Sequence, residues 1–533
     1  MSALPHAAPA LRWRPVERRA AGVRPAPPRW AGPLLALAFA ILYTLTSSGT
    51  LTSKDGGVMY DTAMAIANRH TLALPPHHHG LPGVHGGFYS KYGIAQSVAE
   101  IPLLVLGQAV GAHYAHDVRY PLLAGNVTLA IAMLTNPIIM ALAVWLFFLL
   151  IYELGASVRG ALVAAVLVGA ASPYWPYAKS DFSEPLSALA LTGAVLYLLR
   201  ARATPSAGNF MLSGLFVALA LLAKLTAAFA LPALALYALY AAADQGRVRS
   251  RGVAAWGAPV LGGIALTAAY NLARYGRLAD TGYHAEDLPF HAPLTVGLTG
   301  LLVSPGKGLP WYCPLVLVAL ALWPRLLRRR RAEGLLALGI AAPTLIVFAT
   351  YPVWWGGICW GPRYLLPLVP LMLLPLAFLP DVRAPRALVA VLVAVAVLVQ
   401  VLGVAIHPAR YLATGVKDTQ YLWTPSASPI LAQAWFVGYD ALGLVDPTAA
   451  DAMLPGYPWR HATGTSPTQR LDIAHWSYWW WALLGSYGLN PGVQRAVAAL
   501  LALGLATTLW GLRRGWRASD PSPPTRRRIP AHI

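Results

Sequence analysis

Charged residues are scarce in this sequence, and acidic residues are scarcer still. Of its 533 residues, 11% are charged, 57% are hydrophobic, and Asp and Glu together number 20. A soluble domain of this length needs more charge to cover its surface, so the composition excludes a water-soluble globule. Cys313 and Cys359, the two cysteines, are too few for a disulfide framework or a zinc site, although a single bond between them is left open.

Long apolar runs fill the chain instead, from Leu34 to Leu512. A helix needs roughly 20 residues to cross a hydrocarbon core about 30 Å thick. Lipid offers no partner to open backbone groups, so the crossing segments must be helices. The sequence therefore predicts an all-α polytopic membrane protein with about twelve transmembrane helices.

Short basic clusters between the runs predict the orientation, because cytoplasmic loops carry an excess of Lys and Arg. The net charge of +20 is divided among these clusters and forms no single basic face, so it indicates membrane topology and no nucleic-acid partner. Both termini are then expected in the cytoplasm. The predicted spans are 31–49, 125–152, 160–173, 184–200, 210–224, 226–242, 252–270, 309–324, 334–353, 364–380, 386–406 and 493–511.

This threading divides the chain into four parts. A basic cytoplasmic tail, 1–30, precedes a transmembrane module, 31–406, which carries the long outer loop 50–124. An outer-face segment, 407–492, and a last helix with a basic cytoplasmic tail, 493–533, follow. We expect a multi-pass protein of the inner or plasma membrane whose functional site lies on the outer face, where most of the acidic loop residues fall.

Two apolar runs need separate treatment. A full crossing by 92–111 would put later basic clusters outside, so this segment is predicted to be a helix in the outer interface, with Gln96 and Glu100 toward water. Whether it dips into the bilayer is left open. The run 209–240 is too long for one crossing and is predicted to be a pair of spans with Lys224 at the outer turn.

Ionisable residues gather where the predicted spans meet the outer face. Cations at this depth suit a phosphate, with Arg as a bidentate fork and Lys as a point charge. Carboxylates suit either activation of a hydroxyl or binding of a metal. The candidate residues are Asp55, Tyr60, Asp61, Lys91, Asp181, Glu184, Lys224, Arg363 and Tyr364.

A lipid-linked phosphosugar would use both kinds of group. The cations would hold the departing phosphate, and a carboxylate would activate the acceptor hydroxyl that attacks the sugar. One carboxylate opposite the leaving group implies inversion at the sugar carbon, by analogy with inverting glycosidases.

Two further motifs invite a functional interpretation. Glycines flank Lys307 in SPGKGLPWYCP, which lacks the P-loop pattern; the segment is either a contact to a donor head group or plain re-entry into the next span. Three adjacent histidines, 77–79, are badly spaced for one metal and indicate a solvated loop.

The order of the outer-face motifs resembles the GT-C superfamily of polyprenyl-phosphate-dependent glycosyltransferases. The nearest branch is that of the protein O-mannosyltransferases and the lipid A aminoarabinose transferases, glycosyltransferase family 39-like. The motifs are DGGVMY after the first span, FYSKYG, DFSEPL, LLAKLTA and RYLLPLVP, and in organisation the resemblance covers about residues 30–380. FYSKYG is similar to the family's F-E-K-P-P element. The resemblance implies a GT-C-like fold and transfer from a polyprenyl-phosphate-linked sugar to a lipid, glycan or protein acceptor.

The resemblance also implies roles for individual residues. Asp55 and Glu184 would be the catalytic carboxylates, with Asp55 as general base. Lys91, Lys224, Arg363 and Tyr364 would hold the donor phosphate. Apart from the resemblance, the position of Tyr60, Asp61, Asp181 and Lys307 at the outer face makes them the expected substrate contacts. Ser90 and Gly56 stand where acidic residues are found in the family, so the carboxylates expected of a divalent metal site are reduced, and the cofactor is left open.

The geometry around Asp55 can be predicted in outline. A helix beginning near Gly57 would leave Asp55 in the preceding turn and point Tyr60 and Asp61 together. Repulsion between Asp55 and Glu184 would raise a carboxyl pKa toward the working pH.

A transporter or flippase of lipid-linked glycans is the alternative. Transporters place their sites near the midplane and often show internal repeats, whereas these charges gather at one edge and the sequence shows no repeat.

Overall fold

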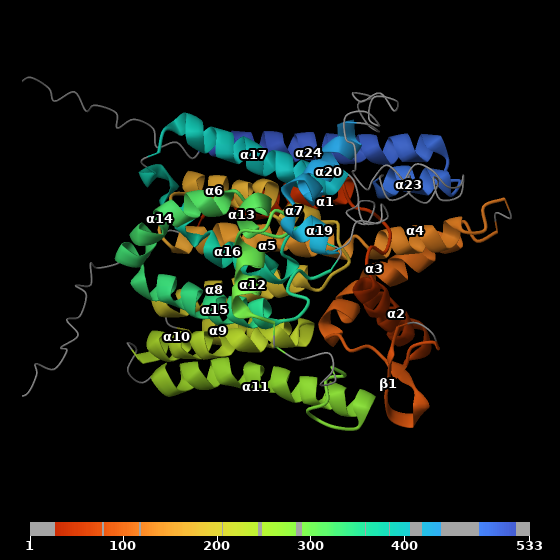
Figure 1. Cartoon of the computed structure of the whole chain (residues 1–533), viewed down its shortest axis with the longest axis horizontal. Coiled ribbons are helices and arrows are strands. Elements are labelled where there is room, and N and C mark those ends of the chain that lie inside the picture. Colours follow the sequence, from red (N-terminus) through yellow and green to blue (C-terminus); the bar gives the residue numbers. More distant parts are fainter. Residues whose placement is uncertain are drawn as a thin grey trace, which may run out of the picture.

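The chain is a bundle of helices that lie side by side along one axis (Figure 1). The computed structural model describes residues 27–76, 79–116, 119–204, 206–243, 248–283, 290, 292–357, 359–382, 384–405, 418–438 and 479–518. Within these residues the sheet structure is one antiparallel hairpin, β1 (Leu81–Pro82) with β2 (Phe88–Tyr89). The predicted all-α class is confirmed. The basic tails, most of 407–492, His77 and His78 lie outside the described residues.

Helix α8 (Glu184–Ala203) forms the centre of the bundle, and most of its side chains are buried. It packs between α5 (Thr135–Glu153) and α9 (Ala207–Ala223). A helix that is buried all round has no need of a polar face. The peripheral helices α11 (Val248–Tyr275) and α24 (Pro491–Ala518) instead expose large apolar side chains, as expected of a surface that faces lipid.

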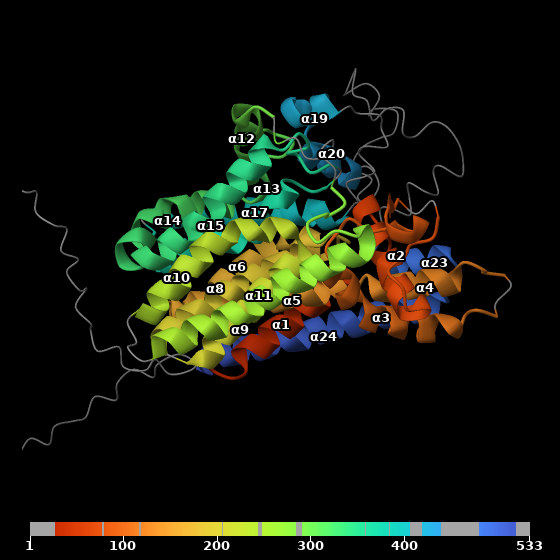
Figure 2. The same ribbon diagram turned by 90° about the horizontal axis from the view of Figure 1, so that it is seen from below.

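The other elements, in chain order, are α1 (Ala31–Leu45), α2 (Lys54–Arg69), η1 (Val84–Gly86), α3 (Ile94–Ala112), α4 (Leu123–Ala132), α6 (Val158–Ala171), α7 (Tyr174–Ala178), η2 (Leu225–Ala230), α10 (Leu231–Ala243), α12 (Leu294–Leu302), α13 (Leu309–Tyr312), α14 (Leu315–Arg329), α15 (Arg331–Thr350), η3 (Arg363–Leu368), α16 (Val369–Met372), η4 (Leu374–Asp381), α17 (Arg386–Ala405), α19 (Asp418–Trp423), η5 (Pro425–Ala427), α20 (Pro429–Phe436) and α23 (Trp480–Ser486). Of these, α12, α19 and α20 protrude from one side of the bundle (Figure 2).

Each predicted span coincides with one of these helices or helix pairs. By length and apolar composition, eight of the described helices can cross a membrane, or nine if the bent pair Arg363–Met372 and Leu374–Asp381 is one span. Shorter apolar helices, among them α1, α6 and α9, make up most of the difference from twelve. A count of about twelve spans therefore stays a prediction.

The bent pair contains prolines at 367, 370, 375 and 380, and Pro362 directly precedes it. Proline has no backbone N–H to donate, so regular α-helix is interrupted and 3₁₀ segments, with a bend of 45°, take its place. The bend in this pair is not predicted by the sequence, whereas the predicted break at Lys224 is present: α9 ends at Ala223, and Lys224 adopts an extended conformation with φ −156° and ψ 122°.

The predicted basic clusters meet at one end of the bundle. Arg200 pairs with Glu153 at 2.9 Å, Arg202 with Glu333 at 2.7 Å, and Arg329 with Asp381 at 2.9 Å. These residues end or begin α5, α8, α14, α15 and η4. Asp55, Glu184 and Lys224 lie at the opposite end. The structure thus separates the two predicted sides, and which side faces the cytoplasm stays a prediction.

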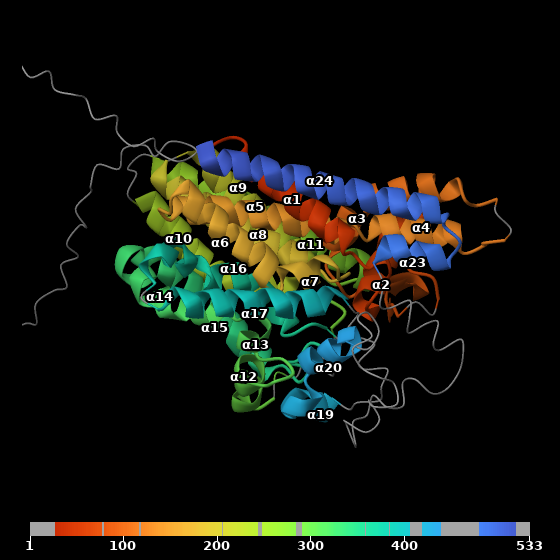
Figure 3. The same cartoon turned by 90° about the horizontal axis from the view of Figure 1, so that it is seen from above.

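The segment 92–111 does not run along the bundle. Helix α3 starts with Gly93 against the carbonyl groups of Leu222 and Ala223 and then forms a hairpin with α4, where Gly107 closely approaches Thr128 (Figure 3). It is apolar and long enough to qualify as a span.

The prediction that Gln96 and Glu100 point toward water is wrong. Both side chains are buried, and Gln96 Nε2 donates to Glu100 Oε1 at 2.9 Å and to Asn136 Oδ1 at 3.2 Å. The polar face of α3 meets polar groups at the start of α5, while apolar side chains such as Val105 and Leu106 remain exposed.

The two ends of the bundle should label on opposite sides of the membrane. We expect a membrane-impermeant thiol reagent to label Asn68→Cys in intact cells and Arg328→Cys only after the membrane is opened. Both positions are exposed, and the wild type is a silent control because Cys313 and Cys359 are buried free thiols. Labelling of position 328 in intact cells would overturn the orientation.

Candidate active site

Helix α2 begins at Lys54, earlier than the predicted start near Gly57. The Ser53 hydroxyl caps the helix by accepting the N–H of Gly56 at 2.9 Å. Asp55 therefore lies in the first helical turn, where a carboxylate is favoured by the helix dipole, and not in a turn before the helix. A Cβ at position 56 would lie 2.2 Å from the Asp181 carboxylate, so this helix start needs glycine.

Asp181 anchors the start of α2. Its Oδ2 accepts the N–H groups of Thr52 at 2.7 Å and Ser53 at 3.0 Å, and its Oδ1 accepts both hydroxyls, at 2.6 and 3.0 Å. Burial raises the pKa of the Asp181 carboxyl, and the hydrogen bonds oppose this rise. With both oxygens engaged, Asp181 positions the helix that carries Asp55. Its contact with substrate stays a prediction.

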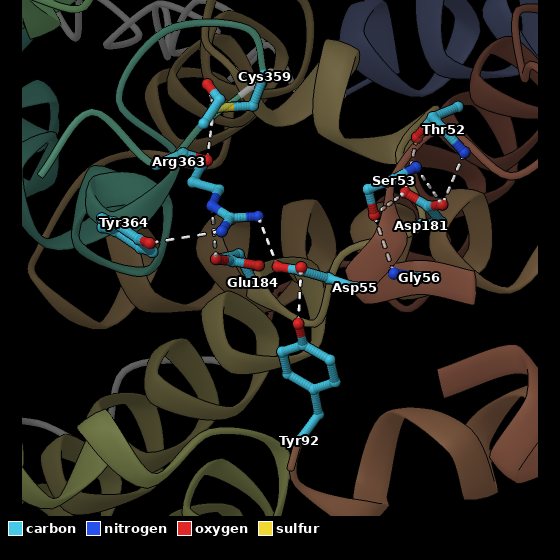
Figure 4. A network of polar contacts seen from close by, with 12 residues as sticks. Thr52, Ser53, Asp55, Gly56, Tyr92, Asp181, Glu184, Cys359, Arg363 and Tyr364 are labelled. Atoms are coloured by element: carbon cyan, nitrogen blue, oxygen red, sulfur yellow. Dashed lines mark hydrogen bonds and ion pairs between the residues drawn. The ribbon is translucent and has the colours of Figure 1, made fainter. Parts of the chain in front are cut away.

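An alternating row of charges crosses the end of the bundle (Figure 4). Arg363 Nη1 lies 2.9 Å from Asp55 Oδ2, and Arg363 Nε lies 3.8 Å from Glu184 Oε1. Glu184 Oε1 in turn lies 2.5 Å from Lys224 Nζ. We call these four residues the ion-pair row. They come from α2, α8, the turn after α9 and the start of η3, so the row joins four separate parts of the chain.

Aromatic side chains enclose this row. The Tyr92 hydroxyl donates to Asp55 Oδ1 at 2.7 Å. The Tyr364 ring lies 5.0 Å from Lys224 Nζ and also 5.0 Å from the Arg363 guanidinium, and Phe182 lies 4.5 Å from that guanidinium on another side. Arg363 is only 13% exposed, and its Nε has no hydrogen-bond partner. This Nε atom faces Glu184 at ion-pair distance.

Asp55 is ionised more readily than an ordinary carboxyl. Burial alone would raise its pKa, but Arg363, the Tyr92 hydroxyl and Lys224 together hold the pKa of Asp55 below its usual value. The predicted rise through repulsion from Glu184 is therefore wrong. The physical reason is that Arg363 stands between the two carboxylates and attracts both.

The segment that carries Lys91 and Tyr92 is clamped by α11. Arg274 donates through Nη1 to the carbonyl group of Ser90, which also accepts the Tyr275 hydroxyl at 3.0 Å. Lys91 Nζ lies 4.8 Å from the centre of the Tyr283 ring, at the rim of the site. Sequence reasoning missed Tyr92 and Arg274, since only a contact across the fold distinguishes them from other interfacial residues.

Three other predicted residues lie apart from the ion-pair row. Tyr60 packs against Leu104 of α3, and burial together with the charge of Asp61 raises the pKa of Tyr60 to about 12. Lys307 is 1% exposed and donates to the carbonyl groups of Gly357 at 3.0 Å and Cys359 at 2.8 Å. It holds the loop that leads to Arg363, and its contact with a donor head group stays a prediction.

A narrow pocket opens beside the row. Glu184, Lys224 and Tyr364 form its polar end, and its remaining wall is mainly apolar: Leu191, Ala227, Ala230, Phe348, Pro367 and Leu368. The pocket encloses about 20 Å³, little more than one water molecule, so a hydrocarbon chain would enter it only if the apolar side chains moved apart.

Divalent metal chemistry does not fit these residues. Asp55 and Glu184 both face cationic side chains, and among the described residues no group of three His, Cys, Asp or Glu side chains is placed to hold a metal. Hard divalent cations require several oxygen ligands that are not neutralised by lysine or arginine.

No protein-family model and no curated protein sequence matches the chain. Solved structures similar to it include ArnT from Cupriavidus metallidurans in the apo state (15% identity over 89% of this chain and 77% of that chain, TM-score 0.48) and bound to undecaprenyl phosphate (14%, 90% and 77%, TM-score 0.46). The archaeal oligosaccharyltransferase AglB from Archaeoglobus fulgidus, in complex with an inhibitory peptide and a dolichol-phosphate, is also similar (13%, 84% and 64%, TM-score 0.44).

With TM-scores below 0.5 and identities of 13–15%, these likenesses do not indicate the function of this chain.

Replacing Asp181 should destabilise the protein rather than weaken substrate binding. Asp181→Asn turns one acceptor atom into a donor that faces other donors, so several hydrogen bonds to a charged group are lost, at about 1.5–3 kcal/mol each. We expect the apparent Tm of the purified protein to fall by several degrees, whereas Asp280→Asn, in a surface loop, should leave it nearly unchanged. An unchanged Tm with weaker substrate binding would restore the substrate role.

Proposed function

We propose that this protein is a membrane glycosyltransferase that moves a sugar from a polyprenyl-phosphate donor to an acceptor hydroxyl on the outer face of the inner or plasma membrane, with inversion. The observation that carries the proposal is the ion-pair row beside a mainly apolar pocket. A phosphate bound to a long hydrocarbon chain matches both parts, and a soluble nucleotide matches only the first.

Arg363 and Lys224 are the proposed phosphate ligands. The guanidinium offers a planar fork, and Lys224 adds a point charge at the mouth of the pocket. Both lie in a partly dehydrated environment, where charge-assisted hydrogen bonds are stronger than in water. Lys91, at the rim, is a third cation for the same phosphate, and Tyr364 fixes the direction of both inner cations through its ring.

Asp55 is the proposed general base. In the structure its charge is balanced by Arg363, and this pairing makes it a weak base. A donor phosphate would compete with Asp55 for the guanidinium, and the loss of this partner would raise the basicity of Asp55 when the donor is in place. Donor binding therefore prepares the base.

The transfer is a single displacement. The acceptor oxygen gives its proton to Asp55 and forms a bond to the sugar carbon, while the bond from that carbon to the phosphate oxygen breaks. Polyprenyl phosphate leaves with the bonding electrons, and Arg363 and Lys224 stabilise its added negative charge. Glu184 keeps Lys224 and Arg363 in place through the ion-pair row.

Purified protein in detergent separates this function from the alternative, a transporter or flippase of lipid-linked glycans. A transferase forms a new glycosidic bond without any membrane compartment, and a transporter does not. Sugar transfer in detergent from a synthetic polyprenyl-phosphate sugar supports the proposal. Donor translocation in vesicles without transfer would favour the transporter.

Removing the proposed base should slow the chemical step and leave donor binding unchanged. Asp55→Asn keeps the size and one acceptor oxygen of the side chain, so kcat should fall by about 10²–10⁴ while the donor still binds. Asp61→Asn, one and a half turns further along the same helix, is the matched control and should cost far less. Near-normal turnover of Asp55→Asn would remove this residue from the mechanism.

Replacing the Arg363 guanidinium by an amine should weaken donor binding, whereas Asp55→Asn should slow the chemical step. Arg363→Lys keeps the charge and loses the bidentate geometry, so donor affinity should fall by about tenfold or more, in line with about 1.5–3 kcal/mol for a hydrogen bond to a charged group. Arg277→Lys, on the exposed loop after α11, is the control. If both variants bind a polyprenyl-phosphate donor as the wild type does, the phosphate is held elsewhere.

A further inference from the structure

A second apolar groove lies at the end of the bundle opposite the ion-pair row. It is formed between α1, α6 and α24, encloses about 390 Å³, and is lined by Leu35, Leu162, Val166 and Leu512, with Arg513 and Trp516 at its edge. In Figure 3, α24 lies along α1 over the length of the bundle, and few of its side chains are buried. The groove therefore lies where the peripheral helix α24 packs against the rest of the bundle.

The edge of the groove is basic, and the described helices that form it, α1, α6 and α24, carry no acidic residue. Within the described part of the chain, Arg513 forms no ion pair or hydrogen bond, and it is exposed. Arg159, at the start of α6, donates to the Trp516 carbonyl at 2.9 Å and lies 5.4 Å from the Trp516 ring, so a second cation stands beside the same edge.

We propose that this groove binds one anionic glycerophospholipid, with an acyl chain against Leu162, Val166 and Leu512 and the phosphate at Arg513. The site is separate from the proposed donor site and does not depend on the proposed transfer reaction. The bound lipid would join α24 to α6 and so stabilise the last helix of the bundle.

Both parts of the lipid match the groove. The apolar wall lies one to two turns inside the helix ends that carry Arg159 and Arg513, so a headgroup at the edge leaves its chain directed toward the middle of the bundle. Burying methylene groups favours any lipid, and the cations select an anionic one. In the predicted orientation this end faces the cytoplasmic leaflet, whose lipids are often anionic.

Lipid retention by the purified full-length protein tests the proposal. The protein in neutral detergent is mixed with phosphatidylglycerol or phosphatidylcholine, and bound lipid is counted by native mass spectrometry alongside the apparent Tm. We expect phosphatidylglycerol to be retained in preference and to raise the Tm. Arg513→Gln should reduce this preference by about fivefold, the value of one cation near an anionic headgroup.

Two further variants complete the experiment. Arg514→Gln is the matched control, because Arg514 stacks on Trp510 at 3.6 Å and not on the groove, and it should retain the preference. Val166→Trp should fill the groove and abolish retention even where Arg513 is intact. The proposal would be overturned if the protein retained the two lipids equally or if Arg513→Gln retained phosphatidylglycerol as the wild type does. It would also be overturned if inorganic phosphate alone raised the Tm, or if the protein formed a dimer that Val166→Trp abolished.

Discussion

The contact between Asp55 and Arg363 is the interaction on which the rest of the proposed site depends. It joins residues separated by 308 positions in the sequence, at 2.9 Å, in surroundings where a lone charge is costly. Asp55 and Arg363 are each positioned by a different set of contacts. Asp181 and Ser53 fix the start of α2, and the proline-rich broken helix with its Lys307-anchored loop presents Arg363. The balance of charge at this point leaves the site neutral overall until an anion enters.

The same contact accounts for the order of events that we propose. A carboxylate that is already paired has a lowered pKa and little basicity, and the guanidinium still attracts a phosphate. An anionic donor that binds Arg363 would at the same time release Asp55 from its ion pair and raise its basicity. Asp55 and Arg363 therefore act as one unit whose state depends on the donor, and the pocket beside Lys224 supplies the apolar contact that favours a lipid.

Much of this arrangement follows from the sequence because charges are rare in it. An ionisable residue next to an apolar run has few possible places, so Asp55, Glu184, Lys224 and Arg363 could be predicted to gather at one face, and the structure brings them together. The break at Lys224 was predictable from length alone, because a run of that size cannot be one span.

The sequence does not show what a polar side chain contacts. Gln96, which is predicted to face water, is buried, and Asp181 and Lys307 are also buried and bonded to groups that are distant in sequence. Periodicity shows which face of a helix is polar but not what packs against that face. For the same reason, the pKa of Asp55 and the clamp of Arg274 on the Lys91 segment required the folded structure.

A structure with a polyprenyl phosphate bound would test the central claim most directly. The account predicts density for the phosphate within hydrogen-bond distance of Arg363 and Lys224, a prenyl chain in the pocket lined by Phe348 and Leu368, and a longer distance between Asp55 and Arg363 than the present 2.9 Å. A phosphate bound elsewhere, with the contact between Asp55 and Arg363 intact, would contradict it.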